Sequence, residues 1–456
     1  MNLPLFNIIL KSRRPALPPK NTIQMSRALI QQLHLKSNDS LNVSIGTRVN
    51  SFNLELAEIP EEEVRISEEM MKEFHLPMEA IQLHADYNQE KQILKLGPII
   101  GLLTDIHWDY GGQPNFKSIH MFCEELHHGI KESGGFFYVF SHKEFPHKGC
   151  YFKEDHWVTS NLPIPDVVYN RVHSRKLEYT KSFKQFRLQL EKMGIPLFND
   201  RFFSKWEVYE QLLKESSLHH YIPETKLFSK ESLMEFVDKY KTVFIKPIHG
   251  SQGKNIIKLE RLDLSSFLFQ TSFPSGRDTT EKKIDINELF QQIKPLLGNR
   301  IYIIQQGIPL MSYQDCPIDY RALCHRSIHN EWQVTSLVAR VSSEQEFVSN
   351  ISRGGVILKP QKALLLIMSR PQALITMNLI KELSIKTAET ISKHSKGIIG
   401  ELGIDIGVDT EGNLRIIEVN FKPSKNFEDG LMKIRPSAKA LIQLCKMLSF
   451  NRRNEL

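Results

Sequence analysis

The strongest pattern in the sequence lies late in the chain, in the stretch Gly403-Ile-Asp-Ile-Gly-Val-Asp-Thr-Glu-Gly-Asn-Leu-Arg-Ile-Ile-Glu-Val-Asn420. Two strand-like runs flank Thr410-Glu-Gly-Asn413, a turn with glycine where a positive φ is needed, so the stretch predicts a β-hairpin. If Asp409 faces Leu414, the register sets Asp405 directly opposite Glu418. Because side chains alternate along strands, Asp405, Glu418 and Asn420 then share one face. The opposite face is aliphatic and consists of Ile404, Ile406, Val408, Ile417 and Val419.

The polar face of this hairpin has the chemistry of a metal site. Two carboxylates and an amide oxygen are hard ligands of the kind that Mg²⁺ takes in proteins. Two carboxylates this close would repel each other without a cation between or beside them. The sequence therefore predicts magnesium ligation by Asp405, Glu418 and Asn420, and the alternative is a solvated hairpin whose acids face water.

A lysine and a glycine-bearing loop form a second element upstream. The strand-like run Thr242-Val-Phe-Ile-Lys-Pro247 leads into His249-Gly-Ser-Gln-Gly253, and a second strand returns from Asn255. Loop amides and Lys246 could all point at a phosphate chain. The Gly-Lys-[Ser/Thr] ending and following helix of a Walker A loop are absent, which argues against a P-loop NTPase. An ordinary turn beside a lysine is the alternative.

Further cations and strands surround these two elements along the chain. Ser204-Lys-Trp-Glu207 has a capping-box pattern, which places Lys205 at the positive end of a helix, where phosphate is favoured. The remaining segments are the strand-to-loop run Ile301-Tyr-Ile-Ile-Gln-Gln-Gly-Ile308, the arginine-bearing runs Asp319-Tyr-Arg321 and Val338-Ala-Arg340, and Asn350-Ile-Ser-Arg-Gly-Gly355.

In this order the elements resemble the ATP-grasp superfamily. The resemblance implies an ATP-grasp fold of two α+β lobes, with ATP and Mg²⁺ as cofactors. Lys205 and Lys246 would hold the phosphates under the loop Gly250, Ser251, Gln252 and Gly253, and Gln305, Gln306 and Ile308 would form the adenine hinge. By the same resemblance Arg321, Arg340 and Arg353 would be the catalytic residues that stabilise transferring phosphate or substrate, with Asn350 nearby.

A narrower resemblance covers most of the chain from about residue 97. Gly101-Leu-Leu-Thr104, Pro165-Asp-Val-Val-Tyr-Asn-Arg171, Phe198-Asn199 and Lys205-Trp-Glu-Val-Tyr209 look like the YheC/YheD type of endospore coat-associated ATP-grasp proteins. That type implies sporulation and spore coat proteins as partners. Many ATP-grasp enzymes carry a glutamate in the hinge where this chain has Gln305-Gln306.

An internal repeat organises the first hundred residues. Ser26-Arg-Ala-Leu-Ile-Gln-Gln-Leu-His-Leu35 aligns with Ser67-Glu-Glu-Met-Met-Lys-Glu-Phe-His-Leu76, and strand-like sequence follows each copy. Two such units are expected to pair about a pseudo-twofold axis into a small β-barrel-like domain, unless the similarity is chance. Residues 96–198 carry a β-loop-α-β signature that predicts a small parallel sheet, the pre-ATP-grasp domain.

These segments predict a multidomain α/β (α+β) protein. The expected domains are 1–95 (β-rich, with the repeat), 96–198 (pre-ATP-grasp) and 199–448 (ATP-grasp), with a tail at 449–456. Within the third, the polar stretch 261–298 is expected to be a surface insertion.

Composition narrows the class of protein. The 456 residues are 41% hydrophobic and 24% charged, which suits a globular chain, and the net charge of +7 is spread without a run of basic residues. No nucleic-acid partner is therefore expected. No membrane span is expected because no apolar stretch approaches roughly 18 residues. Five cysteines without metal-ligand spacing suit a cytoplasmic location. Association with the spore coat is what the YheC/YheD resemblance implies.

The expected activity is that of a carboxylate-amine ligase. Phosphoryl transfer from ATP to a carboxylate gives an acylphosphate, which an amine then attacks; the sequence does not identify the two substrates. One alternative is a non-catalytic nucleotide-binding protein of the spore coat. Another is a kinase for a small hydroxylated compound.

Overall fold

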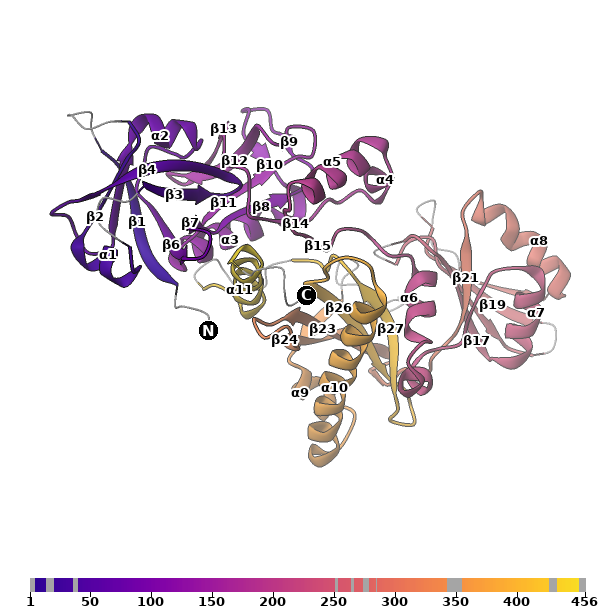
Figure 1. Ribbon diagram of the computed structural model, residues 1–456. Coiled ribbons are helices and arrows are strands. Elements are labelled where there is room, and N and C mark those ends of the chain that lie inside the picture. The colour runs from indigo at the N-terminus through magenta and orange to yellow at the C-terminus, as the bar shows by residue number, and fades with distance from the viewer. Residues whose placement is uncertain are drawn as a thin grey trace.

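The computed structural model describes residues 5–13, 20–35, 40–250, 253–263, 266–273, 279–283, 285–342, 355–425 and 433–450. The chain forms an N-terminal barrel, a second α/β unit and two lobes, each built on its own sheet. In Figure 1 the barrel and the first lobe lie at opposite ends of the molecule, with the second unit and the second lobe between them.

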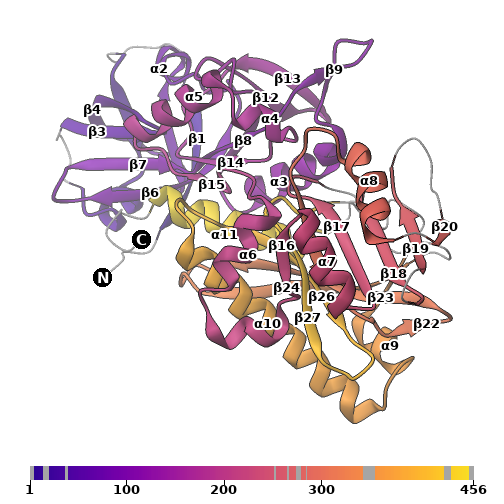
Figure 2. The ribbon, with the colours of Figure 1, turned by 90° about the vertical axis from the view of Figure 1, so that its right-hand side faces the viewer.

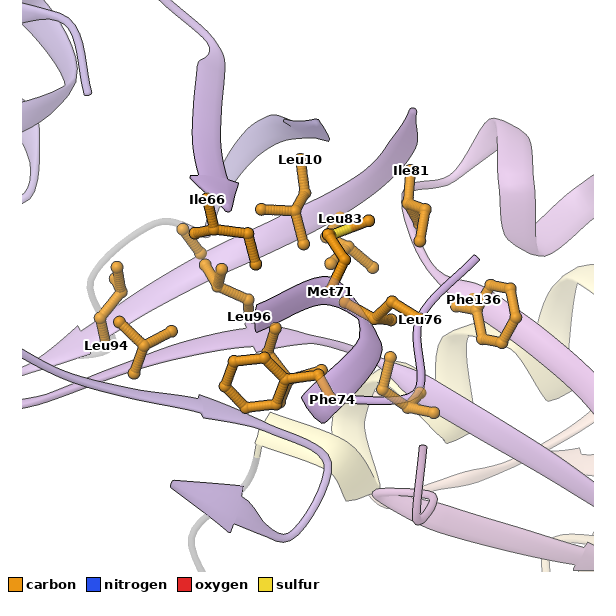
Figure 3. Packing of buried hydrophobic residues seen from close by; sticks show 14 of the residues in the cluster. Leu10, Ile66, Met71, Phe74, Leu76, Ile81, Leu83, Leu94, Leu96 and Phe136 are labelled. Carbon is orange, nitrogen blue, oxygen red and sulfur yellow. The ribbon is translucent and has the colours of Figure 1, made fainter. Parts of the chain in front are cut away.

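Strands β1 to β7 close into the predicted barrel, in the order β1-β5-β2-β4-β3-β7-β6. The strands are β1 (Phe6–Arg13), β2 (Thr22–Met25), β3 (Ser40–Ile45), β4 (Arg48–Leu56), β5 (Glu63–Ser67), β6 (Ile81–Asn88) and β7 (Ile93–Gly97), and the helices are α1 (Arg27–Gln32) and α2 (Glu68–Glu73). Figure 3 shows Met71 of α2, and Phe74 directly after that helix, among strand residues such as Leu83 and Leu96. The barrel is filled by side chains.

The two copies of the predicted repeat make equivalent hydrogen bonds in the barrel. Ser26 Oγ accepts from Leu29 N at 3.1 Å and donates to a carbonyl at 3.0 Å; Ser67 Oγ accepts from Met70 N at 3.2 Å and donates to a carbonyl at 3.1 Å. β2 and β5 run antiparallel, and Gln24 lies opposite Arg65, its own counterpart in the second copy. A residue facing its equivalent across an antiparallel pair is the arrangement expected at a pseudo-twofold axis, so this pairing supports the prediction.

The second unit contains the predicted parallel sheet. β11, β8, β14 and β15 are parallel neighbours, and β12 and β13 extend the sheet as an antiparallel edge. The elements are β8 (Ile99–Leu103), β9 (His107–Trp108), β10 (Pro114–Asn115), the 3-10 turn η1 (Lys117–Ile119), α3 (His120–Glu132), β11 (Phe136–Phe140), β12 (Lys148–Lys153), β13 (His156–Asn161), β14 (Val167–Asn170), α4 (Arg175–Glu178), α5 (Lys181–Lys192) and β15 (Leu197–Phe198).

The first lobe is an antiparallel sheet in the order β16-β21-β17-β18-β19-β20, with its core on the face that α7 and α8 cover. Its elements are β16 (Thr225–Leu227), α7 (Lys230–Lys239), β17 (Thr242–Pro247), β18 (Ile257–Arg261), β19 (Ser266–Thr271), β20 (Thr279–Lys283), α8 (Ile286–Leu297) and β21 (Tyr302–Gln306). The preceding elements α6 (Lys205–Leu212) and η2 (Ser216–Tyr221) bury residues in the core of the second lobe.

The prediction of a surface insertion at 261–298 is wrong. β19 pairs with β18 along its length, and α8 packs on the sheet. Phe267 and Phe269 of β19 and Leu289 and Ile293 of α8 are buried in the core of the first lobe. The segment is therefore part of that lobe's sheet and helical layer.

The second lobe is an antiparallel sheet in the order β25-β24-β23-β26-β27, covered on its apolar face by α10 and neighbouring elements. Its elements are β22 (Ser312–Tyr313), β23 (Cys316–Arg326), β24 (Trp332–Val341), β25 (Val356–Leu358), α9 (Pro360–Leu365), α10 (Arg370–His394), β26 (Glu401–Val408), β27 (Leu414–Asn420) and α11 (Pro436–Phe450). Helix α11 contacts β23 and β24 of this lobe and also packs on α3 of the second unit. In Figure 1 α6 lies between the sheets of the two lobes, and Figure 2 shows the long helix α10 beside β26 and β27 of the second lobe.

Candidate functional site

The hairpin of β26 and β27 gathers its acids on one face, as its sequence predicts. Asp405 lies directly opposite Glu418, and Gly403 lies opposite Asn420. The turn is closed by Asp409, whose Oδ1 accepts from Glu411 N at 3.0 Å and from Asn413 N at 2.8 Å. Asp405, Glu418 and Asn420 therefore project to the same side of the sheet.

The register beside the turn differs from the prediction by one residue. Val408, and not Asp409, faces Leu414, and a bulge between Asp405 and Ile406 absorbs the shift. In consequence Ile416 occupies the buried position that was predicted for Ile417, and Ile417 stays outside that core cluster. The bulge restores the pairing of the acids.

Asp405 is held by two arginines from the neighbouring strands. Arg321 of β23 lies opposite Asp405 and binds both of its oxygens, with Nη2 at 2.6 Å from Oδ2. Arg340 of β24 binds the same oxygen at 3.1 Å and also forms a bidentate pair with Asp319, at 2.6 and 2.7 Å. Burial alone would raise the pKa of Asp405, but the two guanidinium groups hold it below its usual value.

Glu418 is paired with a lysine from between the lobes. Ser204 and Glu207 form the predicted capping box, which makes Lys205 the first residue of α6. The Lys205 backbone N donates to the carbonyl of Ile248 at 2.9 Å, and its Nζ forms an ion pair with Glu418 Oε1. Burial opposes ionisation of Glu418, yet Lys205 keeps the pKa of this carboxyl below its usual value.

Lys246 lies on the sheet of the first lobe and completes the cluster. Its Nζ donates to Gln305 Oε1 at 2.7 Å, and Gln305 in turn donates to Thr225 Oγ1 at 3.0 Å. Burial, and then the charge of Lys205, lower the pKa of Lys246 to about 8, against the opposing effect of Glu418. Lys246, Lys205 and Glu418 thus share one electrostatic neighbourhood, although they come from three separate elements.

The predicted hinge places its two glutamines in different surroundings. Gln305 faces Lys246, whereas Gln306 Oε1 accepts from the backbone N of Glu224 at 3.3 Å. Gly307 N donates to Thr242 O at 2.8 Å, and Ile308 is half-buried. The hinge therefore lies at the Thr242 end of β17.

The glycine loop begins at the other end of β17, after Pro247. Gly253 has a φ of 62°, and β18 returns antiparallel to β17. Gly250 O accepts a hydrogen bond at 3.3 Å from Arg175 Nη2 of the second unit. Sequence reasoning missed Arg175, because its contact with the loop depends on how two distant segments fold together. Ser251, Gln252, Asn350 and Arg353 lie outside the described residues.

The donor set on the hairpin fits a hard divalent cation. Within the described segments no three His, Cys, Asp or Glu side chains gather as metal ligands, so Asn420 would have to be the third ligand beside Asp405 and Glu418. Asn420 Nδ2 is buried and without a hydrogen-bond partner in the described part of the chain. An amide whose NH₂ group is tied to nothing is free to turn its oxygen toward a cation.

The paired carboxylates, the two lysines and the glycine loop lie between two α+β lobes, and the family model described as "YheC/D like ATP-grasp" matches residues 194–448. The chain belongs to the YheC/D-like ATP-grasp family. The match spans more than half of the chain and includes both lobes, so the predicted ATP-grasp fold and family are confirmed.

Two curated proteins and several solved structures are similar to this chain over much of its length. It is 27% identical to the endospore coat-associated protein YheD of Bacillus subtilis (strain 168) over 402 residues, which are 86% of each chain. It is 22% identical to the endospore coat-associated protein YheC of the same organism over 293 residues, 64% of this chain and 78% of that one. Among solved structures, the VanG D-Ala:D-Ser ligase of Enterococcus faecalis is 12% identical, with a TM-score of 0.45 over 77% of this chain and 98% of the other.

None of the helices in the described segments is long and apolar enough to cross a membrane.

Proposed function

We propose that this ATP-grasp chain binds ATP with Mg²⁺ between its two lobes and uses it to activate a carboxylate for attack by an amine. The observation that supports this is the meeting of Lys205 and Lys246 with the Asp405 and Glu418 hairpin. The lysines come from α6 and the first lobe, and the acids come from the second lobe. Cations and paired acids facing each other across two lobes suit a metal-bound triphosphate.

In this proposal Asp405, Glu418 and Asn420 would hold the metal. When bound, Mg²⁺ would offset the negative charge of the terminal phosphates. The ion pairs that Arg321 and Lys205 make with these carboxylates neutralise the acids. Since neither cation side chain is fully buried, both can reorient toward phosphate oxygens when the acids acquire another partner.

The remaining side chains would bind and orient the nucleotide. The hinge residues Gln305, Gln306 and Ile308 lie at one end of β17 and the glycine loop at the other, so adenine at the hinge would direct the phosphates past Lys246 toward the loop. The guanidinium of Arg340 binds Asp319 and Asp405, so Arg340 would position the Asp405 carboxylate. Asn350 and Arg353, with Ser251 and Gln252, remain proposed contacts by family resemblance.

The reaction would proceed in two transfers. The γ-phosphoryl group moves from ATP to an oxygen of the substrate carboxylate, releasing ADP and forming an acylphosphate. The amine nitrogen then attacks the acyl carbon, the bond to the phosphate oxygen breaks, and an amide, inorganic phosphate and a proton result. The lysines and arginines act by charge and position, and no covalent bond to the protein is needed.

The test is ADP release that depends on both an added carboxylate and an added amine, screened over amino acids, peptides and cell-wall fragments. Lys246→Ala and Glu418→Ala should each reduce turnover by at least about 100-fold while the proteins stay folded, because each removes a charge from the phosphate region. The matched control is Lys226→Ala. It removes an exposed lysine from the sheet that also carries Lys246, and Lys226 is paired with Glu235 of α7. Turnover like that of the wild type in both site variants would reject the assignment.

A second candidate is a non-catalytic nucleotide-binding protein of the spore coat. Two observations favour it: the relatives YheD and YheC are named endospore coat-associated proteins, and Asp405 is saturated by Arg321 and Arg340. In that case ATP would raise the melting temperature without any carboxylate- or amine-dependent ADP release. The ligase proposal predicts both a higher melting temperature with ATP and ADP release that depends on the carboxylate and the amine.

A further inference from the structure

A cation from the second unit reaches the glycine loop of the first lobe. Arg175 is the first residue of α4, and its Nη2 donates to Gly250 O at 3.3 Å. The next turn of chain reinforces the contact, since the ring of Tyr179 lies 6.3 Å from the ring of His249, the residue before Gly250. The segment 175–179 therefore borders the loop that follows Lys246.

The guanidinium of Arg175 has unused donor capacity. Nη1 is buried and has no hydrogen-bond partner among the residues that the structure describes. The ring of Phe202 packs against the group at 4.8 Å and supplies no acceptor there. Glu178, the carboxylate nearest in sequence, forms an ion pair with Lys422 at 2.5 Å. A partly buried cation with a free N–H group is stabilised strongly by any anion that arrives beside it.

The position of Arg175 determines which part of a nucleotide it would meet. The hinge lies at the Thr242 end of β17, and the loop that contacts Arg175 begins beyond Pro247 at the opposite end. Glu418, one of the proposed metal ligands, lies close enough to oppose the lowering of the Arg175 pKa by burial. Arg175 is thus at the end of the site farthest from the hinge, near the β26–β27 hairpin that carries the proposed metal ligands.

We propose that Arg175 binds the terminal phosphoryl group of ATP, exchanging the carbonyl of Gly250 for phosphate oxygens. The proposal rests on the proposed function, because it requires ATP in the site between the lobes. A guanidinium presents two parallel N–H groups that match two phosphate oxygens, and Nη1 and Nη2 of Arg175 supply such a pair. The second unit would then contribute directly to the recognition of the triphosphate and of the phosphate carried to the substrate.

The experiment measures the affinities of the full-length protein for AMPPNP, ADP and AMP by calorimetry in the presence of Mg²⁺. In Arg175→Ala the affinity for AMPPNP should fall about 10- to 100-fold, while those for ADP and AMP stay within about threefold of the wild type. Arg175→Lys keeps a charge without the fork and should give an intermediate loss. Lys176→Ala removes the exposed neighbouring charge on the same helix and should bind all three nucleotides as the wild type does.

The outcomes separate this inference from the proposed function. If wild-type protein binds AMPPNP and Arg175→Ala binds it equally well, the Arg175 assignment is overturned and the proposed function stands. Equal losses for AMPPNP and ADP would also overturn it, since they would indicate only support of the loop. If the wild type binds none of the nucleotides, the proposed function fails and takes this inference with it. Should Arg175→Ala not fold, the ratio of AMPPNP to ADP affinity in Arg175→Lys decides the matter by the same criteria.

Discussion

At the scale of single residues, the most informative group is Lys246. Burial and the neighbouring Lys205 lower its pKa to about 8, and its Nζ is held by the neutral oxygen of Gln305. A neutral acceptor stabilises an ammonium group less than an anion does. A phosphate beside Lys246 would therefore raise its pKa, and nucleotide binding should be coupled to proton uptake.

The affinity for ATP with Mg²⁺ should consequently depend on pH. Below about pH 8 Lys246 is charged in both the free and the bound protein, so its protonation does not change the affinity with pH. Above it the free protein loses the proton that the complex keeps, and affinity should fall by up to about tenfold per pH unit. Calorimetry from about pH 7 to 9.5 measures both affinity and proton uptake. Lys246→Arg keeps its charge and should flatten the profile; an equal decline in that variant would contradict this origin.

At the scale of elements, the sequence predicted the chemistry of the hairpin but not its bulge. Strand alternation has a period of two, and Ile416 and Ile417 are chemically identical, so the pattern could not show which of them enters the core. The prediction for 261–298 was wrong because that stretch is polar on average. The alternating residues Phe267 and Phe269, which enter the core, are outnumbered by polar neighbours. Local signals such as the capping box at Ser204 were predictable because every group involved is within three residues.

The cap of α6 should matter for both stability and binding. Ser204 Oγ accepts from Glu207 N at 3.1 Å, so Ser204→Ala should reduce the free energy of unfolding by about 1 kcal/mol. Because this cap places Lys205 beside Glu418, nucleotide affinity should fall as well. Thr180→Ala removes a similar cap from α5, where Thr180 Oγ1 accepts from Phe183 N at 3.3 Å. Denaturant unfolding and calorimetry on both variants test this, and an equal change of affinity in the two would count against it.

At the scale of the whole molecule, a buried charge network joins the second unit to the second lobe. Glu401, at the start of β26, is fully buried and contacts Arg171 at 3.0 Å, His325 at 3.4 Å, Lys425 Nζ and the hydroxyl of Tyr169. Arg171 and Tyr169 come from the end of β14 in the second unit. Asp405 follows four residues later on the same strand, so this network fixes the base of the strand that carries the proposed metal ligand.

Removing this carboxylate should destabilise the junction between the two units. Glu401→Gln leaves Arg171 and Lys425 buried without their counter-charge, which typically costs about 3–5 kcal/mol. Glu235→Ala breaks an exposed pair with Lys226 and should cost no more than about 1 kcal/mol. Burial opposes ionisation of Glu401, but Lys425, His325 and Arg171 hold its pKa well below the usual value. Its contribution is therefore present above the pKa of the unfolded chain and lost as the pH falls, so denaturant unfolding near neutral pH should show the full difference and unfolding in acid a smaller one. A Glu401→Gln protein as stable as Glu235→Ala at neutral pH would mean that the network does not hold the units together.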